Sequence, residues 1–146
     1  MLTTDGGIKM ELALQQKLLS QAKEAMKLAY VPYSQFRVGA AVLDQDGRIH
    51  LGCNIENAAY GPTNCAERTA LFSAIAAGAA PRTFTAIAVV GDTIDPITPC
   101  GVCRQVMIEL CEPDTLVIMG NLAGDSRVTT VQELLPGAFS PSSLER

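Results

Sequence analysis

Apolar positions follow two different periods along this chain, and each change of period marks a predicted element. From about residue 10 to residue 30 the apolar positions recur at helical spacing, which predicts an amphipathic helix ending before Pro32. The predicted buried stripe of this helix consists of Leu14, Leu18, Ala22, Met26 and Ala29. Residues 1–9 are polar and contain glycine, so we expect a flexible lead-in ahead of the helix.

The pattern changes to strand-like runs after residue 36. Residues 37–43 and 48–53 flank an Asp-Gly pair, which predicts a β-hairpin. Short apolar runs at 85–90 and 115–119 predict buried strands, and 128–131 predicts an edge strand. Residues 65–77 and 100–111 are rich in helix formers. The order helix, two strands, helix, strand, helix and two strands predicts an α/β protein with one mixed sheet and helices on its faces, in three α/β/α layers.

Composition narrows the range of partners. The 146 residues are enough for one domain, predicted here over 10–146, and a hydrophobic fraction of 48% supplies its core. The net charge is −4 and the basic residues are scattered, which argues against a nucleic-acid partner. We see no secretory signal and no apolar run of the roughly 18 residues that a membrane span requires. Five cysteines, an odd number, suggest a reducing compartment, and we expect a cytoplasmic protein without a membrane partner.

A split group of cysteines carries the strongest chemical signal. Cys65 is followed two residues later by Glu67, and a Cys-x-x-Cys pair, Cys100 and Cys103, stands where a loop enters the next predicted helix. Three soft ligands suit Zn²⁺, and a site with three protein ligands leaves a fourth position for water. The partial positive charge of a helix N-terminus favours thiolates. The sequence therefore predicts a hydrolytic zinc site in which Glu67 moves protons.

A closed, purely structural zinc site is the alternative, and it requires a fourth protein ligand. Cys111 lies eight residues beyond Cys103, or about 12 Å along a helix, which is too far to share the ion. Spacing leaves His50 and Cys53 open as that ligand. Outside such a role, we expect His50 to face solvent from a strand, and Cys53 and Cys111 to be core thiols.

The arrangement of motifs resembles that of the short, zinc-dependent cytidine deaminases. The similarity spans about residues 12–139, nearly the whole chain. The matching segments, in order, are 33–40 (YSQFRVGA), 54–58 (NIENA), 64–70 (NCAERTA), 99–105 (PCGVCRQ) and 134–139 (LLPGAF).

The resemblance implies one zinc ion per subunit, bound by the three cysteines of the split group. It implies that Glu67 carries protons while activated water replaces the 4-amino group of cytidine or deoxycytidine, giving uridine or deoxyuridine and ammonia in pyrimidine salvage. By the same resemblance, Arg68 donates hydrogen bonds to ligand sulfurs and offsets their negative charge, and Gln105 supports the site from outside the ligand sphere.

Substrate residues follow from the same comparison. Asn54 and Glu56 are two apart in an extended segment, so both project to one side, where an amide and a carboxylate suit ribose hydroxyls. A carboxylate beside the sugar repels a phosphate, which favours a free nucleoside. Phe36 resembles the aromatic residue that packs on the pyrimidine, although a core position is the alternative. The backbone N–H of Ala66 is expected to meet the base carbonyl.

The resemblance also implies a homotetramer. Tyr60 and Phe139 are similar to residues that enter a neighbouring subunit's site, with ordinary packing as the alternative. Three other functions stay open: a deaminase for an aminopyrimidine nucleoside antibiotic, a polynucleotide cytosine deaminase, and a structural zinc module. Asn54 and Glu56 argue against the first, the absence of a basic groove against the second, and Glu67 against the third.

Overall fold

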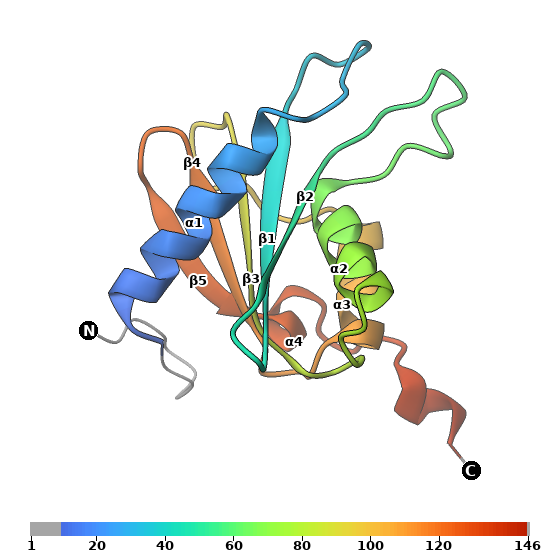
Figure 1. Ribbon diagram of the computed structural model, residues 1–146. Coiled ribbons are helices and arrows are strands. Elements are labelled where there is room, and N and C mark those ends of the chain that lie inside the picture. Colours follow the sequence, from blue (N-terminus) through green and yellow to red (C-terminus); the bar gives the residue numbers. More distant parts are fainter. Residues whose placement is uncertain (1–9, 146) are drawn as a thin grey trace.

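The computed structural model describes residues 10–145, and the predicted lead-in over residues 1–9 lies outside this range. The five strands form one sheet, and helices pack on both of its faces (Figure 1). In chain order the elements are α1 (Leu12–Met26), β1 (Val38–Asp44), β2 (Ile49–Cys53), α2 (Ala66–Ala76), β3 (Phe84–Gly91), α3 (Gly101–Leu110), β4 (Leu116–Asn121), β5 (Ser126–Thr130), α4 (Val131–Leu134) and the 3₁₀ helix η1 (Pro141–Leu144).

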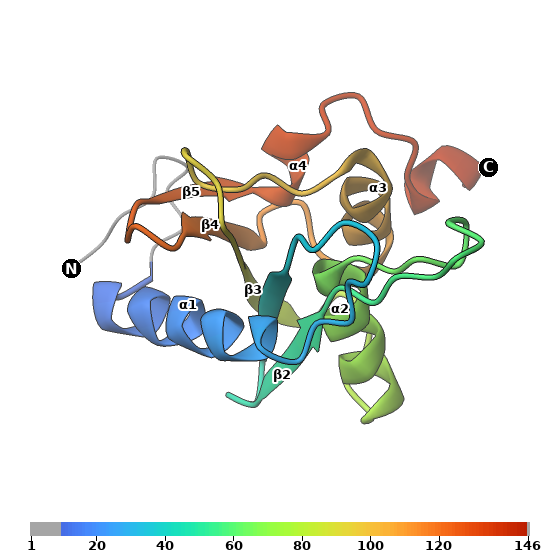
Figure 2. The ribbon, with the colours of Figure 1, turned by 90° about the horizontal axis from the view of Figure 1, so that it is seen from above.

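The sheet is mixed, as the order of elements predicted. Its strand order is β2-β1-β3-β4-β5, with β3 and β4 parallel and the other neighbours antiparallel. Helix α1 covers one face, whereas α2 and α3 cover the other (Figure 2). Successive side chains of β1 point to opposite faces of the sheet. Ala40 and Val42 pack in the core beneath α2 and α3, whereas Ala41 and Leu43 pack in the core beneath α1. The three-layer α/β/α prediction is confirmed.

Helix α1 is shorter than the predicted range of 10–30. Its predicted stripe is buried at Leu18, Ala22 and Met26, but Leu14 is only half-buried. The end of α1 is fixed from the following segment, because the Arg37 Nη1 donates to the carbonyl oxygens at the helix end, at 2.9 Å for Ala29. This cap comes from a residue 8 to 11 positions further along the chain, and the helix itself carries no signature of it.

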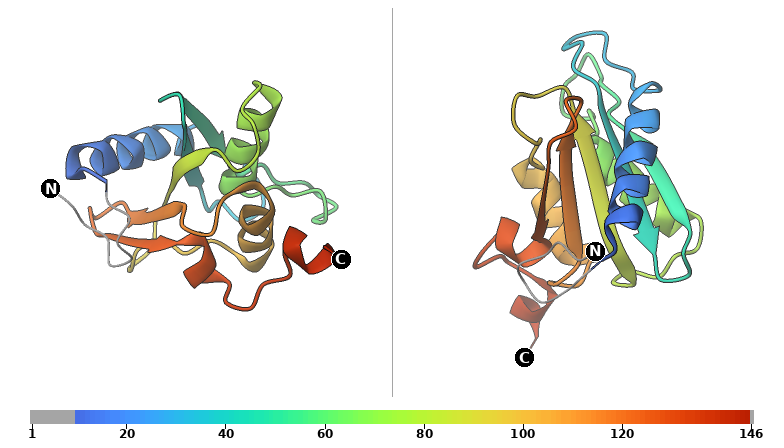
Figure 3. Two further views of the ribbon diagram at one scale, coloured as in Figure 1. Left: turned by 90° about the horizontal axis from the view of Figure 1, so that it is seen from below. Right: turned by 90° about the vertical axis from the view of Figure 1, so that its left-hand side faces the viewer.

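The region after β5 also departs from the prediction. The edge strand predicted at 128–131 is confirmed as β5, which ends one residue earlier, at Thr130. A short helix that was not predicted, α4, begins at Val131, and the Thr130 hydroxyl caps it by accepting the Glu133 N–H. The segment beyond α4 then runs beside α3 (Figure 3), where the Gln105 side-chain amide donates to the Phe139 carbonyl. Within residues 10–145, no helix combines the length and apolarity needed to cross a bilayer.

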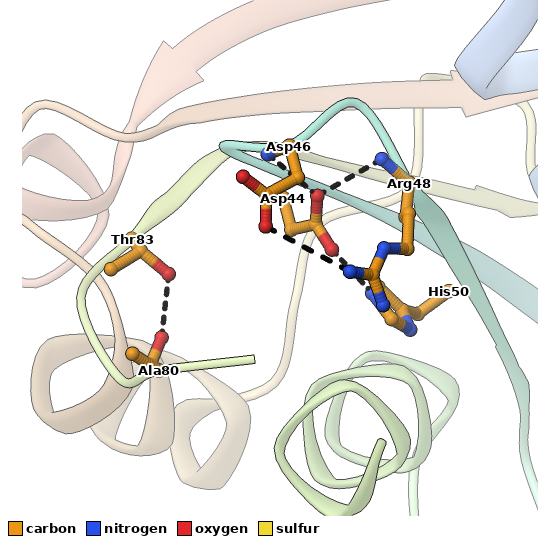
Figure 4. Close-up of polar contacts among 6 residues, drawn as sticks. All are labelled: Asp44, Asp46, Arg48, His50, Ala80 and Thr83. Atoms are coloured by element: carbon orange, nitrogen blue, oxygen red, sulfur yellow. Dashed lines mark hydrogen bonds and ion pairs between the residues drawn. The ribbon is translucent and has the colours of Figure 1, made fainter. Parts of the chain in front are cut away.

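His50 contradicts the expectation that it faces solvent. Its side chain is 11% exposed and its Nε2 lies 2.8 Å from a carboxylate oxygen of Asp44. The other oxygen of Asp44 accepts the backbone N–H groups of Asp46 and Arg48, at 2.9 Å each, and so closes the hairpin turn (Figure 4). His50 therefore pairs across the start of the β1–β2 hairpin, an arrangement that period-2 alternation alone does not reveal.

This carboxylate makes stability depend on pH in a defined direction. The hydrogen bond with His50, followed by the backbone bonds, holds the pKa of Asp44 below its usual value. A depressed folded-state pKa stabilises the fold above the unfolded pKa, and that contribution disappears as pH falls through the folded value. We expect Asp44→Asn to lower Tm near pH 7, with the deficit shrinking as pH is lowered to about 3. Scanning calorimetry at both pH values measures this, with the exposed Asp46→Asn as control. A deficit that is equal at both values contradicts the assignment.

Candidate metal centre and active site

The three predicted ligands lie together at the N-termini of two helices. Cys65 and Cys100 occupy the N-cap positions of α2 and α3, and Cys103 lies in the first turn of α3. Their sulfur atoms lie within 4.8 Å of one another. Both helices pack on the same face of the sheet, which brings cysteines 35 residues apart into one cluster.

The geometry of the cluster suits zinc. The Sγ atoms of Cys65 and Cys100 are 3.7 Å apart. Zn–S bonds of about 2.3 Å in a tetrahedron place two sulfurs about 3.8 Å apart, so this pair needs little rearrangement. Three thiolates form a donor set that zinc prefers over harder cations. The cluster fits the zinc ion that the sequence predicted.

Electrostatics within the cluster also call for a cation. A hydrogen bond from Cys103, together with one from Arg68, lowers the pKa of Cys65 to about 5. The same Cys65–Cys103 bond and then burial raise the pKa of Cys103. The protein alone therefore stabilises a thiolate at Cys65 at the expense of Cys103. Full ionisation of the set requires a positive ion.

Among residues 10–145, no fourth histidine, cysteine or carboxylate joins this cluster. His50 is engaged with Asp44, and Cys53 ends β2 as a half-buried thiol rather than a fully buried one. Cys111 is a core thiol, as expected, and burial raises its pKa to about 12. The described chain thus supplies three ligands and leaves one tetrahedral position for a water or substrate atom.

Arg68 contacts two of the three sulfurs. Its Nη2 donates to Cys65 Sγ at 3.2 Å and its Nε donates to Cys103 Sγ at 3.4 Å. These bonds place one positive charge against two ligands of the cluster. Such a charge offsets the electron donation of three thiolates and preserves the acidity of a bound metal.

Glu67 is buried in the first turn of α2, two residues beyond Cys65. Its side chain is 4% exposed, and burial raises its pKa to about 7, with a smaller contribution from the Cys65 charge. A carboxyl group with a pKa near neutrality can both accept and donate a proton under physiological conditions. Its neighbour Ala66 is the first residue of α2, so its N–H lies outside the intrahelical bonding pattern and is available to a ligand.

The predicted substrate residues converge on the segment that leads into β1. Asn54 accepts the Val38 N–H at 2.9 Å and donates to the Phe36 carbonyl at 2.7 Å. Glu56 accepts the N–H groups of Tyr33 and Ser34, at 3.0 and 3.1 Å. Phe36 is 38% exposed, so it does not occupy the core position that was its alternative.

A groove of about 460 Å³ borders this segment. It is lined by Tyr33, Ser34, Glu56, Asn57, Tyr60 and Thr63. A larger cavity of about 680 Å³ lies between the end of α3 and residues 132–145, and it includes none of the clustered cysteines. Of the candidate substrate residues, the groove is lined by Glu56 but not by Phe36, Asn54 or Ala66, and none of the clustered cysteines lines it.

Two exposed aromatic residues complete the predicted set. Tyr60 is 75% exposed and has φ = +58°, a left-handed conformation that is uncommon for a residue other than glycine. Phe139 is 61% exposed, and its carbonyl is held by Gln105. Gln105 thus contacts the C-terminal segment by its side chain. Neither aromatic ring is buried within this chain.

Sequence reasoning missed three residues that shape the site. Ser34 connects Glu56 to Phe36 by hydrogen bonds, and Arg37 fixes the end of α1 just before β1. Arg104 donates to the carbonyls of Pro99, at 2.7 Å, and Leu134, at 2.9 Å. All three lie inside or directly beside motifs that the sequence singled out. Their contacts join residues that are 2 to 30 positions apart, and a linear pattern does not show which of these groups meet.

Comparisons with known proteins bear on this site. Residues 12–119 match the family described as the cytidine and deoxycytidylate deaminase zinc-binding region. A protein of Sporosarcina psychrophila named cytidine deaminase is 56% identical over 129 residues, covering 88% of this chain and 93% of the relative. One of Halalkalibacterium halodurans with the same name is 58% identical over 129 residues, covering 88% and 96%.

Solved structures agree with the sequence relatives. The crystal structure of cytidine deaminase from Burkholderia pseudomallei superposes with a TM-score of 0.85 at 57% identity, covering 89% of this chain and all of that one. Cytidine deaminase from Mycobacterium tuberculosis gives 0.73 at 38% identity, covering 86% and 96%.

Proposed function

Since this chain belongs to the cytidine and deoxycytidylate deaminase family, we propose that it hydrolyses cytidine and deoxycytidine to uridine and deoxyuridine, with release of ammonia. The observation that carries this proposal is the buried Glu67 carboxyl at the start of α2, beside a cluster of three cysteines. A structural zinc site has no use for a buried acid there. A hydrolytic site needs one.

The chain's own residues divide the work of the reaction. Cys65, Cys100 and Cys103 would hold the zinc ion, which would supply Lewis-acid activation of water. Glu67 takes the first proton of the attacking water on a carboxylate oxygen and delivers it to N3 of the pyrimidine, while the remaining hydroxyl adds to C4. Glu67 then takes the proton of that hydroxyl and passes it to the 4-amino group, so that the C4–N bond breaks, ammonia leaves and C4 becomes a carbonyl. Arg68 keeps the ligand sulfurs from donating all their charge to the metal.

Recognition of the nucleoside falls to residues around β1 and β2. We assign the pyrimidine face to Phe36, the base carbonyl to the Ala66 N–H, and the ribose hydroxyls to Asn54 and Glu56. Hydrogen bonds from Ser34 hold the pKa of Glu56 below its usual value, so it carries a negative charge beside the sugar. That charge disfavours nucleotides by repulsion.

The wider setting follows from the same assignment. We place the enzyme in pyrimidine salvage and treat residues 10–146 as one catalytic unit. Free thiols at all five cysteines support a cytoplasmic location. The exposed Tyr60 and Phe139 rings support a homotetramer in which each is supplied to a neighbouring site.

A side-by-side spectrophotometric assay of the zinc-loaded protein tests the function. We expect turnover of cytidine and deoxycytidine, with kcat/KM lower by at least about 100-fold for free cytosine and for deoxycytidine monophosphate. Free cytosine lacks the ribose contacts, and the monophosphate meets the Glu56 charge. Equal processing of cytidine and cytosine contradicts the ribose assignment. No turnover of any of the four contradicts the deaminase assignment.

A further inference from the structure

The backbone of Phe36 is held from both sides by side chains. Its N–H donates to the Ser34 hydroxyl oxygen at 3.0 Å, and its carbonyl accepts from the Asn54 amide at 2.7 Å. More than a third of Phe36 is exposed, so packing against the rest of the chain restrains this residue only in part. The polar contacts fix the backbone from which the ring projects.

The Ser34 hydroxyl joins this arrangement to Glu56. It donates its proton to one carboxylate oxygen of Glu56, while the other oxygen accepts the N–H groups of Tyr33 and Ser34. A hydroxyl that donates its only proton to a carboxylate has its lone pairs free, and one receives the Phe36 N–H. The chain of bonds therefore has one direction, from Phe36 N–H through Ser34 to Glu56, and each bond polarises the next.

The residue between Ser34 and Phe36 adopts an unfavourable conformation. Gln35 has φ = +57°, in the left-handed region that side chains other than glycine seldom occupy. Its N–H donates to the Val31 carbonyl at 3.0 Å, and the Ser34–Phe36 bond spans it. Such strain persists only where surrounding contacts overdetermine the backbone, and it concentrates at functional sites.

We propose that Ser34 is a positioning residue for nucleoside binding, whose hydroxyl couples the Glu56 carboxylate to the backbone of Phe36 so that sugar-binding and base-binding groups form one rigid unit. This inference rests on the proposed function, which assigns ribose to Glu56 and the pyrimidine to Phe36. Ser34 itself is not a catalytic residue. It acts through the two groups that it joins.

A defined kinetic pattern follows. Loss of the Ser34 hydroxyl removes the acceptor of the Phe36 N–H and one hydrogen-bond donor to Glu56. Because Phe36 and Glu56 are then less restrained before binding, the free-energy cost of ordering them is added to nucleoside binding. Glu67 and the zinc ligands lie on α2 and α3 and make no hydrogen bond to Ser34 among the described residues. The defect therefore belongs to KM rather than to kcat.

The experiment compares Ser34→Ala with Ser34→Thr, which keeps the hydroxyl, and with Ser20→Ala, an exposed serine of α1, as matched control. We expect Ser34→Ala to keep one zinc per chain and to raise KM for cytidine about tenfold, with kcat within about threefold. Ser34→Thr restores KM to within about threefold of wild type, and Ser20→Ala leaves it unchanged. An unchanged KM in Ser34→Ala overturns the proposal.

A double-mutant cycle with Phe36→Ala separates positioning from general damage. If Ser34 acts through Phe36, Ser34→Ala raises KM much less in the Phe36→Ala background than in the wild-type protein. If the two increases in KM simply multiply, the residues act independently and the proposal is overturned. Wild-type turnover of cytidine tests the proposed function by itself, so the two failures are distinguishable. If Ser34→Ala does not fold, amide hydrogen exchange on the wild type decides. A Phe36 N–H that exchanges slowly supports the bond to Ser34, and one that exchanges at the unprotected rate overturns it.

Discussion

We expect Glu67→Gln to lose most cytidine turnover while it keeps about one zinc per chain. The amide has nearly the shape of the carboxyl and fits the same buried position, but it neither accepts a proton from water nor returns one to the base. General acid–base groups contribute a factor of about 10² to 10⁴ to the rate, and we expect kcat to decrease by at least about 100-fold. Steady-state kinetics and metal analysis of the purified variant measure both quantities.

Stability distinguishes this loss from unfolding. A buried carboxylate is costly, whereas an amide is neutral, so we expect Tm of Glu67→Gln to equal or exceed that of wild type. Glu109→Gln, at a partly exposed glutamate of α3, serves as control and keeps wild-type turnover. Turnover of Glu67→Gln within about threefold of wild type excludes Glu67 as the proton carrier.

The metal cluster could be predicted from sequence because its information is local. Cys65 with Glu67, and Cys100 with Cys103, each lie within four residues where a loop enters a helix. The strand-like and helical periods then sufficed to predict the order of the main elements along the chain, the mixed sheet and the three layers, but not the order of the strands within the sheet. The scattered basic residues and the net charge of −4 added the prediction that the protein has no nucleic-acid partner.

The hydrogen-bond partners around the site could not be predicted in the same way. The Ser34–Glu56 and Arg104–Leu134 bonds join residues 22 and 30 apart, and only the folded chain brings them together. The environment of His50 could not be predicted either. Alternation along β2 does not reveal that the carboxylate of Asp44, at the end of β1, lies within hydrogen-bond distance of the His50 ring. Sequence patterns report which face of an element is buried, and they do not report which polar groups meet.

Close backbone approach is a further feature that residue types alone leave hidden. From its residue type alone, Gly52 would be expected only to weaken the strand that contains it. In the structure, Gly52 lies in β2 at the point where α2 packs on this strand. A Cβ at Gly52 would lie 2.3 Å from the Ala70 nitrogen and 2.5 Å from the Ala66 carbonyl oxygen. Both are backbone atoms of the helix that carries Cys65 at its start. The glycine therefore sets the distance between sheet and active-site helix.

Gly52→Ala is consequently expected to damage stability and the metal site together. The methyl group cannot be accommodated by turning a side chain, so α2 must shift, at a cost of about 1–3 kcal/mol or more in the free energy of unfolding. The shift moves Cys65 and Glu67 relative to the cysteines of α3, which weakens zinc binding and lowers kcat by at least about tenfold.

Urea unfolding, zinc competition with a chelator and steady-state kinetics measure the three effects of Gly52→Ala. Gly61→Ala is the matched control, because a Cβ there meets only one atom within 4 Å, the Ala59 carbonyl oxygen at 3.9 Å. We expect its free energy of unfolding to stay within about 0.5 kcal/mol of wild type. If Gly52→Ala loses stability but keeps full zinc affinity and kcat, α2 tolerates the shift as a rigid unit together with α3. In that case the cluster is positioned by contacts between the two helices, such as the Arg68–Cys103 bond, rather than by the sheet beneath them.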